Sequence, residues 1–249
     1  MSEKDISEGF SRAVTLMVQS IMMLYIIQYM MQFLQQALGS IGIPGATQGG
    51  EGEGGEGEGG EGGFFEDDFN DNEFNTNLWI EFGSGTLEET NQRLEVEPSS
   101  EQYKGCRSKN KYDLTGKSIE VIANRQGISG NMHVMGIYCS PDEDLPSDNY
   151  YSVQFINGDS VRFRKKIAGT TTDINTVDIE SSPFKIKLVF SENKVEAFYD
   201  CGGGWTSLGE TSLDLDPTMY IFLAGGGMSG NLGKGYFDNF KTNIPLGGQ

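Results

Sequence analysis

FKIKLVFSENKVEAFYD (184–200) alternates apolar and polar residues on both sides of the tripeptide Ser-Glu-Asn. Alternation with a period of two is typical of a half-buried β-strand, because successive side chains point to opposite faces of a sheet. The tripeptide is short enough to close a tight hairpin. The sequence therefore predicts two antiparallel strands, 184–190 and 194–200, joined by a turn.

The same pattern extends outward along the chain. It recurs in YYSVQFI (150–156), SVRFRKKI (160–167) and GYFDNFKT (235–242). Asn-Gly-Asp separates the first two of these runs, and it is a strong hairpin signal because Asn and Gly accept a positive φ angle. Short runs divided by Gly, Asn, Asp and Ser, with no helical window after residue 64, predict two packed antiparallel sheets.

Five segments after residue 63 share a recognisable spacing of strands and loops. They are FFEDDFNDNEFNTNLWIEFG (64–83), RLEVEPSS (93–100), RSKNKYDLTGKSIEV (107–121), FKIKLVFSENKVEAFYDCGGGWTSLGE (184–210) and GKGYFDNFKTN (233–243). Together they resemble concanavalin A-like jelly rolls of the laminin-G and lectin/glucanase type over residues 64–244. The resemblance implies an all-β jelly-roll sandwich that binds carbohydrate or another surface ligand, although the family also contains glycosidases and purely structural modules.

A catalytic role is not expected. Retaining glycosidases need two carboxylates roughly 5 Å apart, and the E-x-D-x-x-E strand pattern of this family does not occur in the sequence. Asp142, Glu143 and Asp144 are consecutive and stand beside prolines, which indicates a solvated loop. We therefore expect that the protein is not an enzyme.

The resemblance also implies a structural calcium ion. Many relatives hold Ca²⁺ between the first and last strands with an Asp from the last one, and Asp238 in GYFDNF matches that position. Asp67 or Asp68 in the opening segment would supply further oxygen ligands, which Ca²⁺ requires. The alternative is that these acids cap the ends of strands.

Exposed aromatic side chains with polar neighbours are typical of saccharide sites. The candidates are Tyr138, Tyr150, Tyr151 and Trp205, of which Trp205 could equally fill the core.

Three cations form a second candidate site. Arg162, Arg164 and Lys166 alternate along one expected strand and therefore share a face, with Lys165 opposite. They would meet an anionic glycan, a phospholipid or an acidic neighbouring subunit; the alternative is a solvated sheet face.

The stretch GGEGEGGEGEGGEGG (49–63) precedes the β domain. Glycine loses much backbone entropy on ordering and the glutamates repel one another, so we expect residues 40–63 to form a flexible, extended linker.

Residues 1–39 are expected to form a hydrophobic anchoring or oligomerisation helix. Residues 13–38 contain no charged residue, Gly or Pro, and as a helix they would span about 39 Å, enough for a bilayer core of roughly 30 Å. A row of glutamines would pair between helices in a membrane, and a spacing of alternating fours and threes indicates a coiled-coil seam. The residues in these patterns include Ile21, Leu24, Gln28, Met31, Gln32 and Gln35. A soluble helical bundle and a cleaved signal peptide are the alternatives.

Charge and cysteine content exclude other classes. The net charge of −18 argues against a nucleic-acid binder, which needs cations to displace counterions from phosphate. Three cysteines allow at most one disulfide, such as Cys139–Cys201, and their spacing does not indicate a zinc site.

The sequence therefore predicts a non-catalytic binding protein displayed on a surface. A β-sandwich head (64–249) would recognise a glycan or another surface ligand, and a homo-oligomerising helix would hold it on a membrane, with the head extracellular, or on a virion. A structural subunit of a virion, envelope or appendage is the main alternative, and a glycoside hydrolase is the disfavoured one.

Overall fold

The computed structural model describes residues 63–99, 102–126, 132–156, 160–179, 184–227 and 233–246. The predicted N-terminal helix, with its glutamine row, and almost all of the predicted linker lie outside these residues. Within the described ranges, no helix is long and apolar enough to cross a bilayer.

The described residues form fifteen β-strands. In chain order these are β1 (Trp79–Gly83), β2 (Gly85–Thr90), β3 (Arg93–Pro98), β4 (Tyr103–Ser108), β5 (Tyr112–Asp113), β6 (Ser118–Gln126), β7 (Met132–Ser140), β8 (Tyr150–Ile156), β9 (Ser160–Ile167), β10 (Thr170–Asp178), β11 (Phe184–Phe190), β12 (Lys194–Asp200), β13 (Thr206–Ser212), β14 (Thr218–Gly227) and β15 (Lys234–Thr242).

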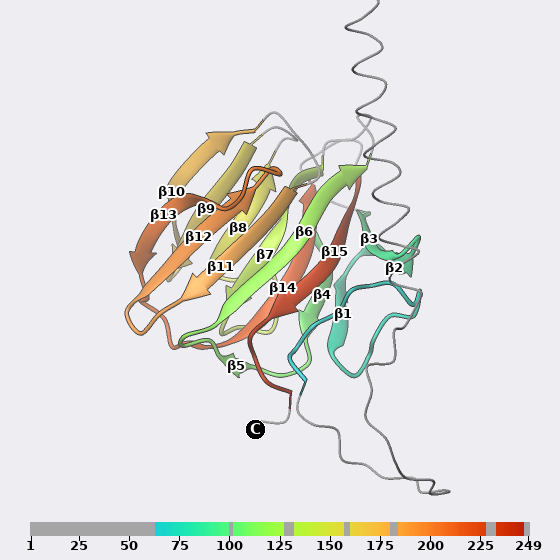
Figure 1. The fold of residues 1–249 in the computed structure, drawn as a ribbon, viewed down its shortest axis with the longest axis horizontal. Helices are drawn as coiled ribbons and strands as arrows, with labels where there is room; N and C mark the ends of the chain where they lie inside the picture. The colour runs from blue at the N-terminus through green and yellow to red at the C-terminus, as the bar shows by residue number, and fades with distance from the viewer. Residues whose placement is uncertain are drawn as a thin grey trace, which may run out of the picture. The chain divides into compact units, whose positions relative to one another are not determined.

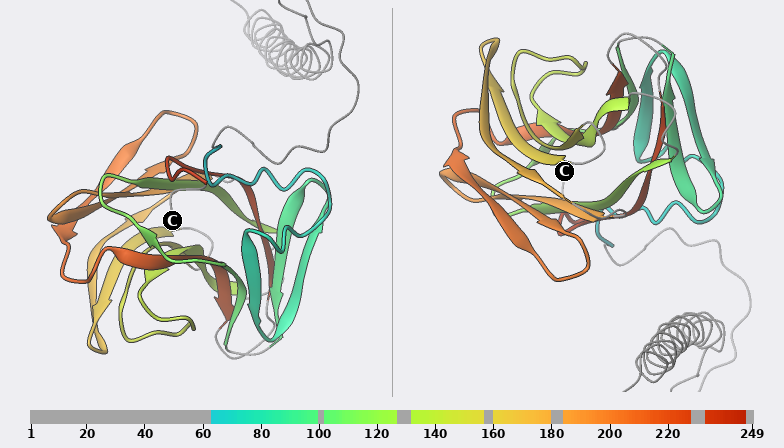
Figure 2. Two further views of the ribbon diagram at one scale, coloured as in Figure 1. Left: turned by 90° about the horizontal axis from the view of Figure 1, so that it is seen from below. Right: turned by 90° about the horizontal axis from the view of Figure 1, so that it is seen from above.

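The strands form two antiparallel sheets. The first sheet has the order β1-β4-β14-β7-β8-β9-β10, with β5 also paired to β14, and the second has the order β13-β12-β11-β6-β15-β3-β2. The two late strands β14 and β15 lie in the middle of their sheets, so the chain crosses repeatedly between layers. Figure 1 shows the second sheet in front, and Figure 2 shows the two layers from their ends. The expectation of two packed antiparallel sheets is confirmed for the described residues.

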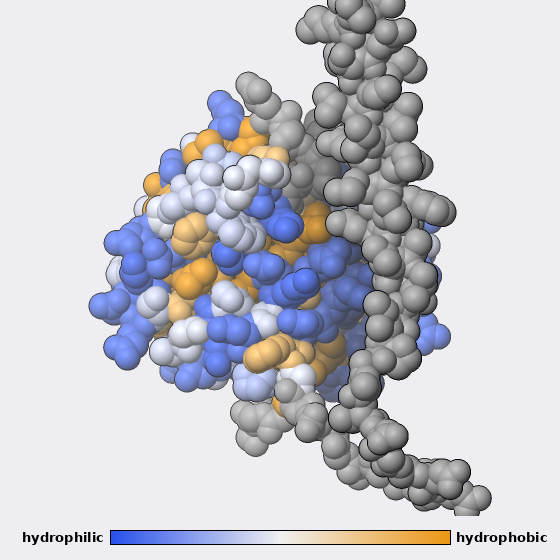
Figure 3. Space-filling view, viewed as in Figure 1, coloured by the Kyte–Doolittle hydropathy of each residue, from blue (hydrophilic) through white to orange (hydrophobic). Residues whose placement is uncertain are grey.

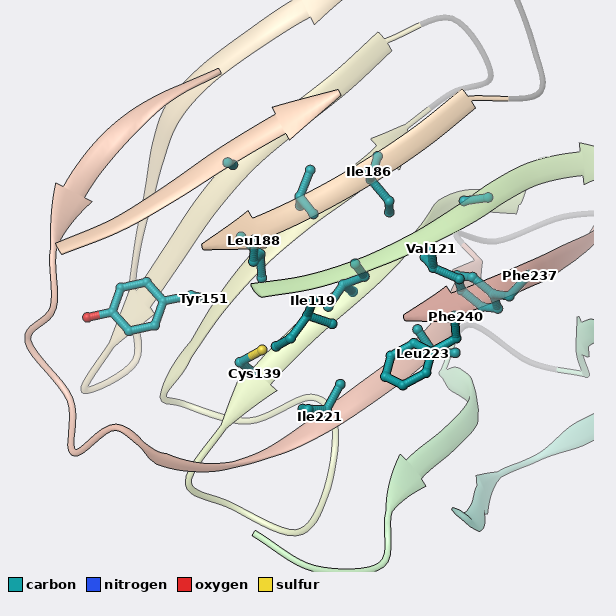
Figure 4. Close-up of a cluster of buried hydrophobic side chains, with 14 of the residues drawn as sticks. Ile119, Val121, Cys139, Tyr151, Ile186, Leu188, Ile221, Leu223, Phe237 and Phe240 are labelled. Atoms are coloured by element: carbon teal, nitrogen blue, oxygen red, sulfur yellow. The ribbon is translucent and has the colours of Figure 1, made fainter. Parts of the chain in front are cut away.

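The main core lies between the two sheets. It is built from inward-facing side chains of β6, β11 and β15 on one side and of β7, β8 and β14 on the other, and Figure 4 shows part of it. Its fully buried residues include Ile119, Val121, Ile137, Cys139, Ile186, Leu188, Ile221, Leu223, Phe237 and Phe240. Each such large apolar side chain contributes about 1.5–3 kcal/mol to folding, which is what holds the layers together.

The opening segment is fixed to the last strand of the second sheet. Phe65 N donates to Ile244 O (2.7 Å), and Asp67 and Phe240 exchange two backbone hydrogen bonds of 3.0 and 2.8 Å. The rings of Phe65 and Trp79 pack with Phe240 at centroid distances of 5.0 and 4.9 Å. The first and last described residues are therefore neighbours.

Strand positions agree closely with the alternation in the sequence. Strands β8, β9, β11 and β12 begin and end at the predicted residues, and Ser191 N donates to Lys194 O (2.8 Å) in the hairpin between β11 and β12. Cys106, Cys139 and Cys201 are all free thiols, so the alternative of a Cys139–Cys201 disulfide is wrong.

The exposed face of the second sheet is mostly hydrophilic, with separate hydrophobic spots over its strands (Figure 3). Most of the residues on which the candidate site depends lie on the first sheet.

Candidate functional site

The first sheet has a second packed face, which points away from the main core and which we call the outer face. Along β7 and β14, Ile137 and Leu223 belong to the main core, whereas Tyr138 and Phe222 belong to a separate apolar cluster. This cluster comprises Tyr138, Leu145, Tyr150, Tyr220, Phe222 and Ala224, with Phe82 and Tyr103 packed against it. Tyr138 and Phe222 are fully buried, so the middle of the outer face is covered.

The loop between β7 and β8 covers part of the outer face. Leu145 at its tip packs into the apolar cluster and is 9% exposed. Hydrogen bonds within the loop fix its shape: Ser147 Oγ donates to Asp142 Oδ2 (2.6 Å), and Asn149 N donates to Ser147 Oγ (2.9 Å). Tyr220 OH on β14 donates to Glu143 Oε1 of the loop (2.9 Å). The loop is thus held against the tyrosines by both apolar and polar contacts.

Three tyrosines gather at the centre of the outer face. The ring of Tyr138 lies edge-on to Tyr103 and Tyr150, at centroid distances of 5.4 and 5.6 Å. Gly226 gives Tyr103 room, since a Cβ atom there would lie 3.0 Å from the Tyr103 ring. Burial raises the pKa of the Tyr138 hydroxyl well above its ordinary value, so this group is a neutral hydrogen-bond donor.

Polar side chains of β8 and β9 continue the outer face beside the tyrosines. The register pairs Gln154 with Arg162 and Ser152 with Arg164. Arg162 Nη2 donates to Gln154 Oε1 (2.6 Å), and Gln154 Nε2 donates to Ser152 Oγ (2.7 Å). Arg164 donates twice to Asp173 on β10, with Nη2–Oδ2 at 3.0 Å. The result is a chain of polar groups in which the two guanidinium groups lie side by side.

Two donors in this region are buried. Arg162 Nε has no hydrogen-bond partner among the described residues, whereas the Tyr138 hydroxyl interacts with the hydroxyl of Tyr103. Arg162 Nε lies 3.7 Å from Asp173 Oδ1, which is close enough for attraction but too far for a hydrogen bond. Burial and the neighbouring charge of Arg164 lower the pKa of Arg162, while Asp173 opposes that change.

The structure gathers five of the seven sequence-predicted ligand residues on the outer face. These are Tyr138, Tyr150, Arg162, Arg164 and Lys166. Lys166 Nζ donates to Asp148 Oδ1 (2.8 Å), whereas Lys165 points to the opposite side and pairs with Asp214 at 2.7 Å. The predicted alternation along this strand is confirmed.

The other two candidates lie elsewhere. Tyr151 is fully buried in the main core, where its hydroxyl donates to Ser212 O (3.2 Å) and accepts from Asp214 N (2.5 Å). Trp205 precedes β13 on the second sheet, is 37% exposed and carries the Lys187 ammonium 3.7 Å from its ring centroid. Neither side chain belongs to the outer face.

Of the three predicted calcium ligands, Asp67 turns inward, whereas Asp68 and Asp238 lie close enough to influence each other. Asp67 Oδ2 accepts a hydrogen bond from Trp79 Nε1 (2.8 Å), so its side chain points toward the core. Asp238 lies one residue after the core residue Phe237, points to the other side of β15 and is influenced by Asp68. Among the described residues, no three acidic, His or Cys side chains are close enough together to hold a metal ion. A calcium ion held by Asp238 with Asp68 stays a prediction, and these two have no third acidic side chain beside them in the described ranges.

Glu89 is an acidic residue that the sequence analysis missed. It lies on β2 opposite the core residue Leu94 and is only 8% exposed. Both carboxylate oxygens are buried without a hydrogen-bond partner among the described residues. Burial, then Asp71 and the charge of Asp67, raise the pKa of Glu89 to about 8. A carboxyl group with this pKa is mostly protonated at neutral pH, so Glu89 is largely neutral in this buried position.

Comparisons with known proteins give the fold but no family. No family model matches the sequence, and no curated protein sequence matches it. Among solved structures, the GH43 protein BlXynB from Bacillus licheniformis is similar at 18% identity and a TM-score of 0.55, covering 72% of this chain and 39% of that one. This chain therefore spans about two-fifths of that hydrolase.

Two shorter proteins match over most of their length. The exoplasmic/lumenal domain of VIP36, in a form bound to Ca²⁺ and Man3GlcNAc, is 13% identical with a TM-score of 0.56, covering 69% of this chain and 86% of that one. Carbohydrate-binding module CBM66 from Bacillus subtilis is 13% identical with a TM-score of 0.50, covering 68% and 96%. At these identities the likeness shows a shared β-sandwich fold, consistent with the expected concanavalin A-like architecture.

Proposed function

We propose that the β-sandwich head is a non-catalytic carbohydrate-binding module whose ligand contacts the outer face of the first sheet. The observation that carries this proposal is the partly exposed edge of the outer face, where the ring of Tyr103 and the cations of Arg164 and Lys166 remain open to solvent. Aromatic rings stack on sugar faces, and the cations donate hydrogen bonds to saccharide oxygens.

The neighbours support the class of ligand. Two of the similar structures are a carbohydrate-binding module and the exoplasmic/lumenal domain of VIP36 with bound Man3GlcNAc. A face that combines aromatic rings with a few placed polar groups is also the usual composition of a sugar site. The tyrosines and arginines of the outer face have this composition.

The absence of catalysis remains part of the proposal, because similar structures also include hydrolases. A glycosidase needs two carboxylates that can donate and accept protons at the sugar. On and beside the outer face, Glu143, Asp173 and Asp178 each already accept a hydrogen bond from a neighbouring side chain. This favours binding over hydrolysis.

A glycan array with the full chain tests the proposal. We expect saccharide binding that Tyr103→Phe weakens, because this change removes the hydroxyl of a partly exposed tyrosine on the outer face and keeps its ring. Trp205→Ala should leave binding unchanged, since that ring lies on the second sheet. No bound glycan, or binding lost only in Trp205→Ala, would refute the outer face as the site; release of reducing sugar from a bound glycan would refute the non-catalytic role.

Finally, we propose that residues 1–39 anchor or oligomerise the protein, and that residues 40–63 tether the head outside a membrane or on a virion surface. The support is the charge-free, Gly- and Pro-free span at 13–38 followed by the acidic glycine repeat. Flotation of the full chain with liposomes should be lost on deletion of residues 1–39. A full chain that stays in solution as a defined oligomer without lipid would replace anchoring with bundling.

A further inference from the structure

The exposed face of the second sheet contains a hollow that the proposed function does not use. It lies over the neighbouring strands β11, β6 and β15 (Figure 1) and has a volume of about 190 Å³. Its lining residues are Glu120, Val121, Ile122, Lys185, Asn239 and Lys241. Drug-sized ligands usually occupy sites of about 300–1,000 Å³, so the size of this hollow suits a small chemical group.

A bulge in β15 lies at this hollow. The pairing of β15 with β6 shifts between Asp238 and Lys241, so that Asn239 and Phe240 together lie opposite Val121. Asn239 has a positive φ angle of 51°, which Asn adopts more readily than most residues. The side chains of Phe240 and Val121 are buried in the core and do not fill the hollow. Bulges often redirect side chains beside functional sites, and this one brings Asn239 and Lys241 to the rim.

Two exposed lysines flank the hollow. Lys185 of β11 pairs in register with Ile122 of β6, and Lys241 of β15 pairs with Glu120 of β6, so the lysines lie on either side of β6. Neighbouring strands are about 4.8 Å apart, which separates β11 from β15 by roughly 10 Å. Each lysine has a flexible four-carbon side chain, so the two ammonium groups can converge on one ligand group between them. Both residues are exposed, so a ligand in solution can reach them.

The charge of these two lysines is not balanced by a direct partner. Among the described residues, Lys185 and Lys241 form no ion pair. Glu120 in the lining lies 4.0 Å from a further lysine of β11, Lys187. Three lysines against one glutamate leave two net positive charges around the hollow, in a protein with a net charge of −18.

Two aspartates beside these lysines accept hydrogen bonds from other groups. Asp200, which pairs in register with Lys185 and is influenced by its charge, accepts from Gly202 N (2.7 Å) and Gly204 N (2.9 Å). Asp238 Oδ1 accepts from the side-chain amide of its neighbour on β15 (2.9 Å). These carboxylates lower the local positive potential without pairing with either lysine, so the two ammonium groups stay available to a ligand.

We propose that this hollow binds the phosphate monoester group of a small soluble molecule, with the ammonium groups of Lys185 and Lys241 donating to its oxygens. A phosphate monoester carries about −1.5 to −2 charges at pH 7, which matches the two unbalanced positive charges. Lysine binds phosphate as a point charge. A soluble ester is favoured over a lipid headgroup because the sheet face around the hollow is mostly hydrophilic (Figure 3). The site lies on the second sheet and is independent of the proposed saccharide site.

Titration calorimetry of the full chain tests this site with methyl phosphate, inorganic phosphate and methyl sulfate. These probes contain no sugar, so they do not report on the outer face. We expect methyl phosphate to bind at least about tenfold more tightly than the singly charged methyl sulfate, the size of one charge-assisted hydrogen bond. Added salt should weaken the binding of methyl phosphate. Inorganic phosphate should bind as methyl phosphate does, because the phosphate group makes the contacts.

Variants locate the site. Lys185→Gln and Lys241→Gln should each weaken methyl phosphate binding severalfold, and the double variant should abolish it. Both residues are exposed, so these variants should fold as the wild type does. Glu120→Gln should raise the affinity, because it removes the carboxylate from the lining. Lys194→Gln is the matched control: it removes the same charge from the same sheet, but Lys194 already pairs with Glu210 at 2.8 Å, so binding should not change.

Three results would overturn the phosphate site. They are the absence of binding by either phosphate probe, equal affinity for methyl phosphate and methyl sulfate, and methyl phosphate binding that survives the double lysine variant. A loss in Lys194→Gln as large as in Lys185→Gln would also overturn it, since the effect would then come from net charge alone. None of these results bears on saccharide binding at the outer face, which the glycan array tests separately.

Discussion

Replacing Glu95 with Gln tests the polar contact that holds β3 to the last strand. Glu95 is 5% exposed and lies on β3, which pairs with β15. Its Oε1 accepts from Arg93 Nη2 (2.7 Å) and its Oε2 from Lys234 Nζ (2.8 Å). Burial alone would raise the pKa of Glu95, but the hydrogen bonds from Lys234, Arg93 and Asn91 outweigh it and hold the pKa at about 2.

The expected loss of stability follows from this pKa. A depression from 4.5 to about 2, at roughly 1.4 kcal/mol per pKa unit, corresponds to about 3 kcal/mol. The Lys234 side chain is 35% exposed, so solvent screening reduces the figure to about 1–2 kcal/mol. Because the folded-state pKa is depressed, this stability is fully present above pH 4.5 and is lost as the pH falls toward 2.

Urea unfolding of wild type and Glu95→Gln between pH 6 and pH 2 measures the effect. The variant should be less stable by about 1–2 kcal/mol at pH 6, and the two proteins should converge near pH 2. Glu97→Gln on the same strand is the control and should follow the wild type, since Glu97 is exposed. A constant difference between wild type and Glu95→Gln across this pH range would refute the reasoning.

Three further predictions follow from single contacts. Tyr151→Phe should cost about 1–2 kcal/mol in urea unfolding, because it removes the hydroxyl that contacts Ser212 and Asp214, and it should leave sugar binding unchanged. Gly136→Ala should destabilise by more than about 2 kcal/mol, because the new Cβ would lie 2.2 Å from Val153 O; unchanged stability would show that the strands can separate there. Leu145→Ala should cost about 2–3 kcal/mol in thermal unfolding, and a loss below about 1 kcal/mol would show that the loop contributes little to packing on the outer face.

The strands were predictable because alternation reflects a physical constraint. A residue on a strand faces one of two sides, so SVRFRKKI alone places Arg162, Arg164 and Lys166 together and Lys165 opposite. The same constraint requires the neighbours Tyr150 and Tyr151 to face opposite sides. Sequence does not say which of the two is the core residue, because that depends on which side the second sheet covers.

Other features depend on contacts between distant segments. Leu145 sits within a run of acids and prolines that is otherwise exposed, and only the fold brings it onto the tyrosines of β7, β8 and β14. Glu89 belongs to an acidic edge strand, and its burial follows from its register opposite Leu94. Neither the loop over the outer face nor an inward carboxylate has a local signal in the sequence.

The orientation of Asp67 could not be predicted for a related reason. Matching Asp238 and Asp67 to a spacing pattern ignores the side of the strand on which each carboxylate lies. Asp67 pairs through its backbone with Phe240, while its carboxylate contacts Trp79 in the interior. The side on which each carboxylate lies depends on the register of the strands, and a spacing pattern does not contain that information.

The junction between the opening segment and β15 also determines how the head responds to mechanical load. Gly63 and Phe65 are held by Leu246 N to Gly63 O (2.6 Å) and Phe65 N to Ile244 O (2.7 Å), and Thr242 Oγ1 donates to Phe65 O (2.9 Å). A pull applied at residue 63 meets these bonds one after another, so the segment would peel at low force rather than shear at high force. After these hydrogen bonds break, the packing of the Phe65 ring against Trp79 resists the pull. Tension on this end would therefore release a short length of chain before it reaches the sheets, and the outer face would keep its shape while the attachment yields.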